Sequence, residues 1–183
     1  MESSDSPWVT MFVCANCVQG EMLPASSDHT RSTIPDFGLP GRVDSIIIPC
    51  AGHIQTEHVL KVLEDGSDVV AVVACEGENC HYSEGSRRCA RRVEYIRSLV
   101  EEIGLGDGRI VLAHFSGTTV EDTLQAAEVN EKIESPATGI LEQKIKVVRD
   151  QVLETLRIVS PNPFSSPEKR TPMTKSSSKE GKW

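Results

Sequence analysis

The sequence predicts an α/β fold, with a small parallel sheet of about four strands and flanking helices. Short apolar runs rich in β-branched residues alternate with longer segments of helical periodicity along the chain. Such alternation is typical of parallel strands joined by right-handed helical crossovers. One run, residues 68–74, contains only Val and Ala after Asp68, as expected for a strand buried on both faces of a parallel sheet.

The first half of the chain contains two expected strands, about residues 8–13 and 44–48. Both are short apolar runs, and the second is ended by Pro49, which cannot donate a hydrogen bond to a neighbouring strand. The connection between them, about residues 19–42, is rich in Ser, Pro and Gly. Its pattern does not decide between a loop and a short helix near Glu21.

Two helices are expected on either side of the central strand. The first covers about residues 56–64, with Thr56 as its N-cap and Gly66 as the residue that stops it. The second covers about residues 86–103 and ends at Gly104. One face of this second helix is apolar, formed by Val93, Ile96, Leu99, Val100 and Ile103.

The rest of the chain continues the alternation with a fourth strand at residues 109–115, a helix at about 119–131 and a final helix at about 139–159. The final helix has apolar residues at 4-3-4-4-3 spacing, namely Leu141, Ile145, Val148, Val152, Leu156 and Val159. Such a stripe has to be covered. Packing on this chain's own sheet or helices is favoured over docking on another subunit.

Together these elements predict a flavodoxin-like parallel domain over residues 1–134, a C-terminal amphipathic helix over 135–160 and a flexible tail over 161–183. The tail is rich in Ser, Pro and Lys, a composition that does not support a packed core. A chain of 183 residues with 38% hydrophobic content can bury one ordinary core. One domain with extensions is therefore expected.

Charge and composition exclude several classes of protein. The formal net charge is −8, and nucleic-acid binding needs a concentrated basic face, so no nucleic-acid partner is expected. No run approaches the roughly 20 apolar residues that cross a bilayer, so no direct membrane insertion is expected. Six cysteines in a chain that starts with a polar segment and lacks an apolar export segment indicate a cytoplasmic protein with metal or redox chemistry rather than a disulfide framework.

Five cysteines follow the expected strands. Cys14, Cys50 and Cys75 each come at the end of an apolar run, and Cys17 and Cys80 complete the spacings CxxC and CxxxxC. In open α/β sheets, ligands bind outside the carboxyl ends of the strands. These five thiols are therefore expected to converge on one rim of the sheet, where a metal cluster is the simplest reason to gather them.

Three kinds of chemistry fit such a group of thiols. An iron–sulfur cluster is favoured over structural zinc, because zinc sites more often use two similar pairs and these pairs differ. The third is thiol–disulfide exchange at Cys14 and Cys17. Cys89 lies within an expected helix, away from a strand end, and is interpreted as a buried, inert thiol.

Other residues near the cysteines have two interpretations each. His81 follows Cys80 and His53 lies close after Cys50, and each is either a structural residue or a ligand or hydrogen-bond donor at a metal site. Cations crowd the start of the helix at 86–103, namely Arg87, Arg88, Arg91 and Arg92. They form either a solvated face with Glu84 and Glu94 as counterions, or a surface that holds an acidic protein or anionic cofactor or raises a cluster's potential.

The motifs PCAG, VLK, Cys75-x4-CHY and RR, with FVCANC upstream, resemble the delta subunit of methyl-viologen-reducing hydrogenase over about residues 9–128. The resemblance implies a [2Fe-2S] electron-transfer subunit that works with an electron-bifurcating, heterodisulfide reductase A-like flavoprotein, and with other redox subunits. It also implies complexes of anaerobes, of the hydrogenase, formate dehydrogenase or benzoyl-CoA reductase type. No independent catalysis is expected, and a zinc-stabilised interaction module is the alternative.

The family positions implied by the resemblance correspond to Cys14, Cys17, Cys50, Cys75 and Cys80. These are five cofactor-binding candidates for four ligand places. Cys14, Cys17, Cys75 and Cys80 are the expected metal ligands, and Cys50 is expected to shield the cluster or to exchange as a ligand. The long connection after Cys17, Cys89, the C-terminal helix and the tail are departures from the family pattern.

Overall fold

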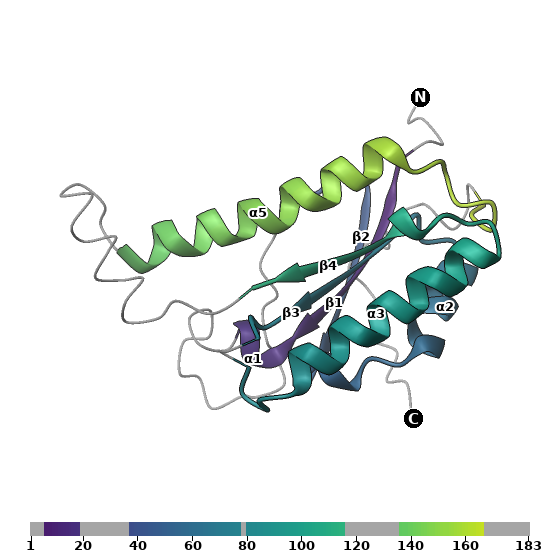
Figure 1. Cartoon of the computed structure of the whole chain (residues 1–183). Coiled ribbons are helices and arrows are strands. Elements are labelled where there is room, and N and C mark those ends of the chain that lie inside the picture. Colours follow the sequence, from purple (N-terminus) through teal and green to yellow (C-terminus); the bar gives the residue numbers. More distant parts are fainter. Residues whose placement is uncertain (1–5, 19–36, 78–79, 116–135, 167–183) are drawn as a thin grey trace, which may run out of the picture.

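A parallel sheet of four strands organises the computed structural model, which describes residues 6–18, 37–77, 80–115 and 136–166. In spatial order the strands are β2 (Arg42–Ile48), β1 (Trp8–Cys14), β3 (Val69–Ala74) and β4 (Ile110–His114), and every neighbouring pair is parallel (Figure 1). The order 2-1-3-4 is that of the first four strands of flavodoxin-like proteins. The predicted α/β class with a small parallel sheet is confirmed.

The two central strands are buried along their whole length. All residues of β1 and of β3 are buried, whereas β2 at one edge is partly exposed throughout. This difference follows from position, because β1 and β3 have a paired strand on each side and helices over their faces. It also explains why the run of Val and Ala in β3 shows no polar alternation.

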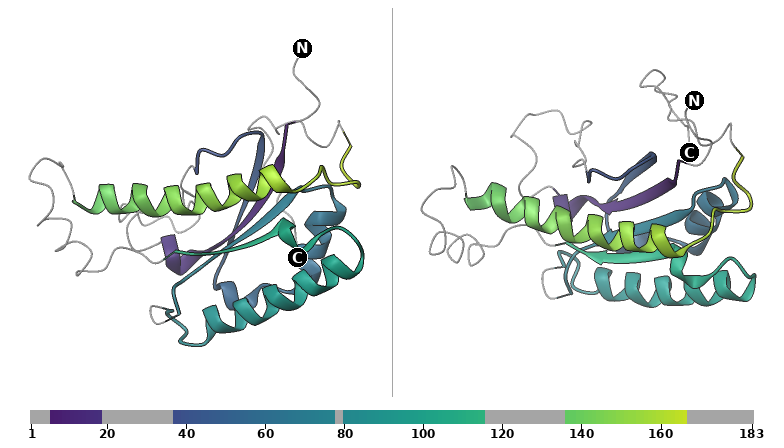
Figure 2. Two further views of the ribbon diagram at one scale, coloured as in Figure 1. Left: turned by 45° about the horizontal axis from the view of Figure 1, so that its top comes forward. Right: turned by 90° about the horizontal axis from the view of Figure 1, so that it is seen from above.

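Helices cover both faces of the sheet. The helices α2 (Thr56–Glu64) and α3 (Gly85–Glu102) lie on one face, and α5 (Pro136–Ile158) lies on the other (Figure 2). Val148 and Val152 of α5 are fully buried in the core. The apolar stripe of α5 therefore packs on this chain's own sheet, as the sequence favoured.

The start of α2 differs from the sequence prediction. Its N-cap is Gln55 rather than Thr56, and Gln55 forms a reciprocal capping box with His58, whose Nδ1 accepts the Gln55 backbone N–H at 3.2 Å. A side chain with both a donor and an acceptor can replace Ser or Thr in such a box. The end of α2 is as predicted, because Gly66 follows the C-cap with φ of +112°.

Hydrogen bonds fasten the chain at the amino ends of the strands. The buried side chain of Asn162 donates to the carbonyl oxygens of Leu63 at 2.7 Å and Ser67 at 2.6 Å. The Asp68 carboxylate accepts the backbone N–H groups of Asn162 at 2.7 Å and Trp8 at 2.8 Å. The described part of the expected tail, residues 161–166, is thus packed against the domain.

Three shorter helices complete the described chain: α1 (Ala15–Val18), and the 3-10 turns η1 (Ala51–His53) and η2 (Asp107–Arg109). The helix expected at 119–131, the short helix considered near Glu21 and the tail beyond residue 166 lie outside the described residues.

Candidate metal centre

The topology of the sheet brings two cysteine sites side by side. Cys14 is the last residue of β1, and Cys75 directly follows β3, which pairs with β1. The strand order changes direction between β1 and β3, and ligands of open α/β sheets bind at this point of reversal. The site therefore lies where the fold by itself leaves a crevice.

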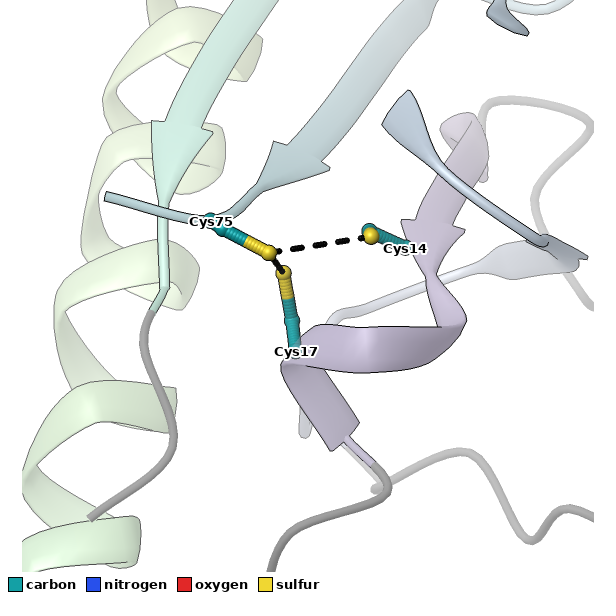
Figure 3. Close-up of side chains that lie close together, drawn as sticks. All are labelled: Cys14, Cys17 and Cys75. Atoms are coloured by element: carbon teal, nitrogen blue, oxygen red, sulfur yellow. Dashed lines mark hydrogen bonds between the residues drawn. The ribbon is translucent and has the colours of Figure 1, made fainter. Parts of the chain in front are cut away.

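Three thiols meet at this point (Figure 3). The Sγ atom of Cys75 lies 3.0 Å from that of Cys17 and 3.8 Å from that of Cys14, and all three atoms lie within 4.8 Å of one another. The single turn of α1 returns Cys17 to Cys75 after the chain leaves β1. All three side chains are buried. We call Cys14, Cys17 and Cys75 the thiol trio.

The other two expected ligands, Cys50 and Cys80, meet at Gly85, the first residue of α3. A Cβ atom added to Gly85 would lie 2.6 Å from the Cys50 Sγ atom and 3.1 Å from the Cys80 Sγ atom. Both sulfurs therefore rest against the Gly85 backbone. Gly52 is equally close, since its added Cβ would lie 2.9 Å from the Gly85 Cα atom. The two glycines let η1 approach the start of α3.

Backbone N–H groups point at this second pair of thiols. The Gly52 N–H donates to the Cys50 Sγ atom and the Ser86 N–H donates to the Cys80 Sγ atom, each at 3.3 Å. Such bonds stabilise a thiolate and are among the interactions that tune a metal–sulfur centre. Cys50 and Cys80 are thus equipped alike, although the sequence favoured Cys80 as the ligand.

The thiols perturb one another strongly. Hydrogen bonds from Cys17 and then Cys75 lower the pKa of Cys14, whereas its own bond to Cys14 raises the pKa of Cys17. The pKa of Cys75 is raised to about 12, chiefly by Cys14, and burial raises the pKa of Cys50. Crowded thiols of this kind do not all ionise unless a cation compensates them, and metal ligation supplies that compensation.

Two further residues hold the Cys75 backbone. Its carbonyl oxygen accepts the Ser86 hydroxyl at 2.5 Å and lies 3.1 Å from the Nδ1 atom of His114. Sequence reasoning did not select either residue. His114 had a signal, because it ends the fourth strand and so falls on the same rim as the cysteines.

Cys89 and the two histidines singled out in the sequence play other parts. Cys89 is fully buried within α3, and burial raises its pKa to about 12, which agrees with an inert thiol. The rings of His81 and Tyr82 meet edge to face with centroids 4.9 Å apart. His53 is exposed at the end of η1. Among the described residues, the compact metal-binding group contains only the thiol trio.

The donor set fits a metal held by sulfur. Every member of the trio is a buried thiol, and thiolates prefer zinc or iron–sulfur clusters. A metal–sulfur distance of about 2.3 Å gives a tetrahedral edge of about 3.8 Å, the distance found between the Cys14 and Cys75 sulfurs. An α/β sheet with such a group at its point of reversal defines a metal- or cluster-binding domain.

Residues 9–135 match the family described as methyl-viologen-reducing hydrogenase, delta subunit, and the chain belongs to that family. It is 32% identical over 93 residues to an F420-non-reducing hydrogenase iron-sulfur subunit of Archaeoglobus profundus, a match that covers 51% of this chain and 66% of the relative. It is also 32% identical over 88 residues to the vhu iron-sulfur subunit of the F420-non-reducing hydrogenase of Methanopyrus kandleri, covering 48% of this chain. The chain spans just under two thirds of these two relatives, 66% of each.

A larger relative contains a similar segment. The chain is 28% identical over 152 residues to a ferredoxin:CoB-CoM heterodisulfide reductase subunit of Methanosarcina mazei, the one designated by the letter A, and this match covers 76% of the chain but 18% of the relative. The family resemblance inferred from the motifs is therefore confirmed, and related proteins are named as iron–sulfur subunits. Within the described part of the chain, no helix has the length and apolar character needed to cross a membrane.

Proposed function

We propose that this chain is an electron-transfer subunit that carries one [2Fe-2S] cluster within a larger redox complex. The observation that carries the proposal is the convergence of five thiols at one end of the sheet, as the thiol trio and the Cys50–Cys80 pair at Gly85. The names of the relatives as iron–sulfur subunits support it. When bound, such a cluster accepts and donates one electron at a time.

Four of the five thiols would hold this cluster. Cys14, Cys17, Cys75 and Cys80 are the ligands predicted from the sequence. The closeness of Cys50 to Cys80 and its matching N–H bond support Cys50 as the fifth candidate. In a two-iron cluster each iron takes two protein ligands, so a division into the trio on one side and the Cys50–Cys80 pair on the other suits two irons.

The residues around the thiols would prepare the site. The rigid ends of β1 and β3 fix Cys14 and Cys75 before a metal binds, and the N–H groups of Gly52 and Ser86 favour the thiolate forms of Cys50 and Cys80. The buried trio would be kept from water and oxidants. A reducing cytoplasm belongs to the proposal, because the thiols must be reduced to bind metal.

A heterodisulfide reductase A-like flavoprotein is the proposed partner. The similarity to the heterodisulfide reductase protein of Methanosarcina mazei supports this, because a segment like this chain forms part of that larger protein. Separate and fused forms of one domain often act on the same neighbours. We therefore propose a role in passing electrons to or from such a flavoprotein, in an electron-bifurcating complex of the hydrogenase, formate dehydrogenase or benzoyl-CoA reductase type.

The proposal is tested by purifying the full chain without oxygen and measuring iron, acid-labile sulfide and zinc. About two irons and two sulfides per chain, with an S = 1/2 electron paramagnetic resonance (EPR) signal after dithionite reduction, are expected for a [2Fe-2S] protein. One zinc per chain, no iron and no signal after anaerobic iron and sulfide reconstitution would rule out the electron-carrier role.

Structural zinc is the second candidate, and one distance favours it. The 3.8 Å between the Cys14 and Cys75 sulfurs is the edge of a tetrahedral four-thiolate site for a single ion. In that case the trio and one more cysteine would hold zinc, and the chain would be an interaction module. The same metal measurement separates the two functions.

A further inference from the structure

A group of exposed cations lies on α3 beside the thiols. Arg87, Arg88 and Arg91 are exposed within the first two turns of this helix. We call these three residues the arginine face. It stands out because the chain as a whole carries a net charge of −8.

The arginine face is unfavourable for the helix itself. Cations near a helix N-terminus oppose the helix dipole, and like charges three or four residues apart repel each other. The first turn of α3 contains no acidic residue, and its N-cap, Glu84, makes no side-chain capping bond. Glu84 pairs with Arg87 at 2.8 Å, but within the described residues no ion pair joins Arg88 or Arg91 to a carboxylate. This cost has no return in the fold.

Arg92 shows what a structural arginine looks like in the same helix. It is half-buried and donates to the carbonyl oxygens of Gly52, at 3.0 Å, and Ile54. Arg92 therefore fastens the loop that follows Cys50. Arg88 and Arg91 point to a different use, since their side chains are exposed on the outer side of the helix.

The arginine face adjoins the thiols directly. Gly85 rests against the sulfurs of Cys50 and Cys80, and the Ser86 N–H donates to the Cys80 sulfur. Arg87 and Arg88 are the next two residues. Tyr82, two residues after Cys80, is 53% exposed. A cationic and aromatic surface thus lies immediately outside the Cys50–Cys80 side of the site.

We infer that the arginine face, together with Tyr82, docks an acidic surface of a redox protein that exchanges single electrons with the cluster of this chain. The inference rests on the proposed function and adds the side and the charge of the contact. Arginine and tyrosine are enriched at interface centres, and complementary charge steers association. The acidic partner would also neutralise the repulsion within the first turns of α3. Each transfer moves one electron from a reduced centre to an oxidised one, with no bond made or broken.

The test uses the full, cluster-loaded chain and two haem proteins as probes. Cytochrome b5 is acidic and cytochrome c is basic, and each accepts one electron at its ferric haem. The chain is reduced with dithionite and freed of excess reductant without oxygen. Stopped-flow haem absorbance then gives the second-order rate constant at salt concentrations from about 20 to about 200 mM, which shortens the range of electrostatic attraction severalfold.

The inference predicts that the rate with cytochrome b5 falls as salt rises, which is attraction. The net charge of −8 alone predicts the opposite, because like net charges repel less at high salt. In the variant R88E/R91E the low-salt rate with cytochrome b5 should fall at least about tenfold. The matched variant K146E/R157E changes the net charge equally at two exposed residues of α5, and it should stay within about twofold of the unchanged chain.

Three results would overturn the inference: a rate with cytochrome b5 that rises with salt, equal losses in the two double variants, or a loss in R88E/R91E that follows from a lowered cluster potential in redox titration. Loss of the EPR signal in the unchanged chain would instead contradict the proposed function. The two failures are therefore distinguishable.

Discussion

The two ends of the sheet differ in how their buried polar groups are satisfied. At the amino ends of the strands, the Asp68 carboxylate and the Asn162 amide bond to backbone groups of the same chain. At the carboxyl ends, the trio of buried thiols has mainly other thiols as neighbours. One end is complete within the chain, whereas the other is arranged for a bound metal. Stability and function are thus separated along the strands.

This comparison predicts that removing a thiol of the trio has the largest effect on the metal. Cys75→Ser replaces the sulfur that contacts both other members, and more than about 80% of the bound iron should be lost, because a hydroxyl is a poor ligand for iron in a thiolate site. Iron content and the EPR signal measure this. Cys89→Ala, which removes a thiol outside the trio, is the control and should keep the iron. Equal loss in both variants would contradict the assignment of the site.

A substitution at Gly85 should disturb the cluster without removing a ligand. In Gly85→Ala the new methyl group would lie 2.6 Å from the Cys50 sulfur and 3.1 Å from the Cys80 sulfur, so one or both thiols must move. Iron content should fall by about half or more, or the EPR g values should change, although Ala favours the helix by up to about 1 kcal/mol. Gly77→Ala is the matched control, since nothing lies within 4 Å of its added Cβ. An unchanged cluster in Gly85→Ala would show that neither Cys50 nor Cys80 is a ligand.

At the other end of the sheet, a substitution should affect stability but not the metal. Asn162→Ala leaves the carbonyl oxygens of Leu63 and Ser67 without this donor, and the free energy of unfolding should fall by about 2–3 kcal/mol. Urea unfolding of the full chain, followed by circular dichroism without oxygen, measures it. Asn16→Ala removes an amide that donates to the Pro49 carbonyl oxygen in an exposed position at the thiol end, and should cost less than about 1 kcal/mol. Similar losses in both would remove the contrast between the two ends.

The smallest expected effect is a gain in stability at the arginine face. R88E/R91E replaces two cations near the N-terminus of α3 with anions, and the free energy of unfolding should rise by about 0.5–1 kcal/mol. The same urea measurement detects it, and the gain should shrink at high salt. Greater stability combined with slower electron transfer would mark a residue pair kept for binding. A loss of stability would mean that Arg88 and Arg91 support the fold.

The elements of this protein follow from local sequence patterns. The alternating apolar runs indicated the four parallel strands, and the bounds of α2 are those that its periodicity and Gly66 predict. The position of the cysteines after β1, β2 and β3 also places them on one rim, because the carboxyl ends of parallel strands share one edge. These features depend on residues close together in the chain, so the sequence alone determined them.

Only the tertiary structure decided how distant segments meet. It placed Cys50 with Cys80 through the approach of Gly52 to Gly85, and it brought Asn162 to Leu63 and Ser67, which lie 99 and 95 positions away in the chain. No periodicity encodes such contacts, because they depend on the packing of whole helices against the sheet. The sequence therefore determined which residues reach the rim, and the fold decided which of them touch.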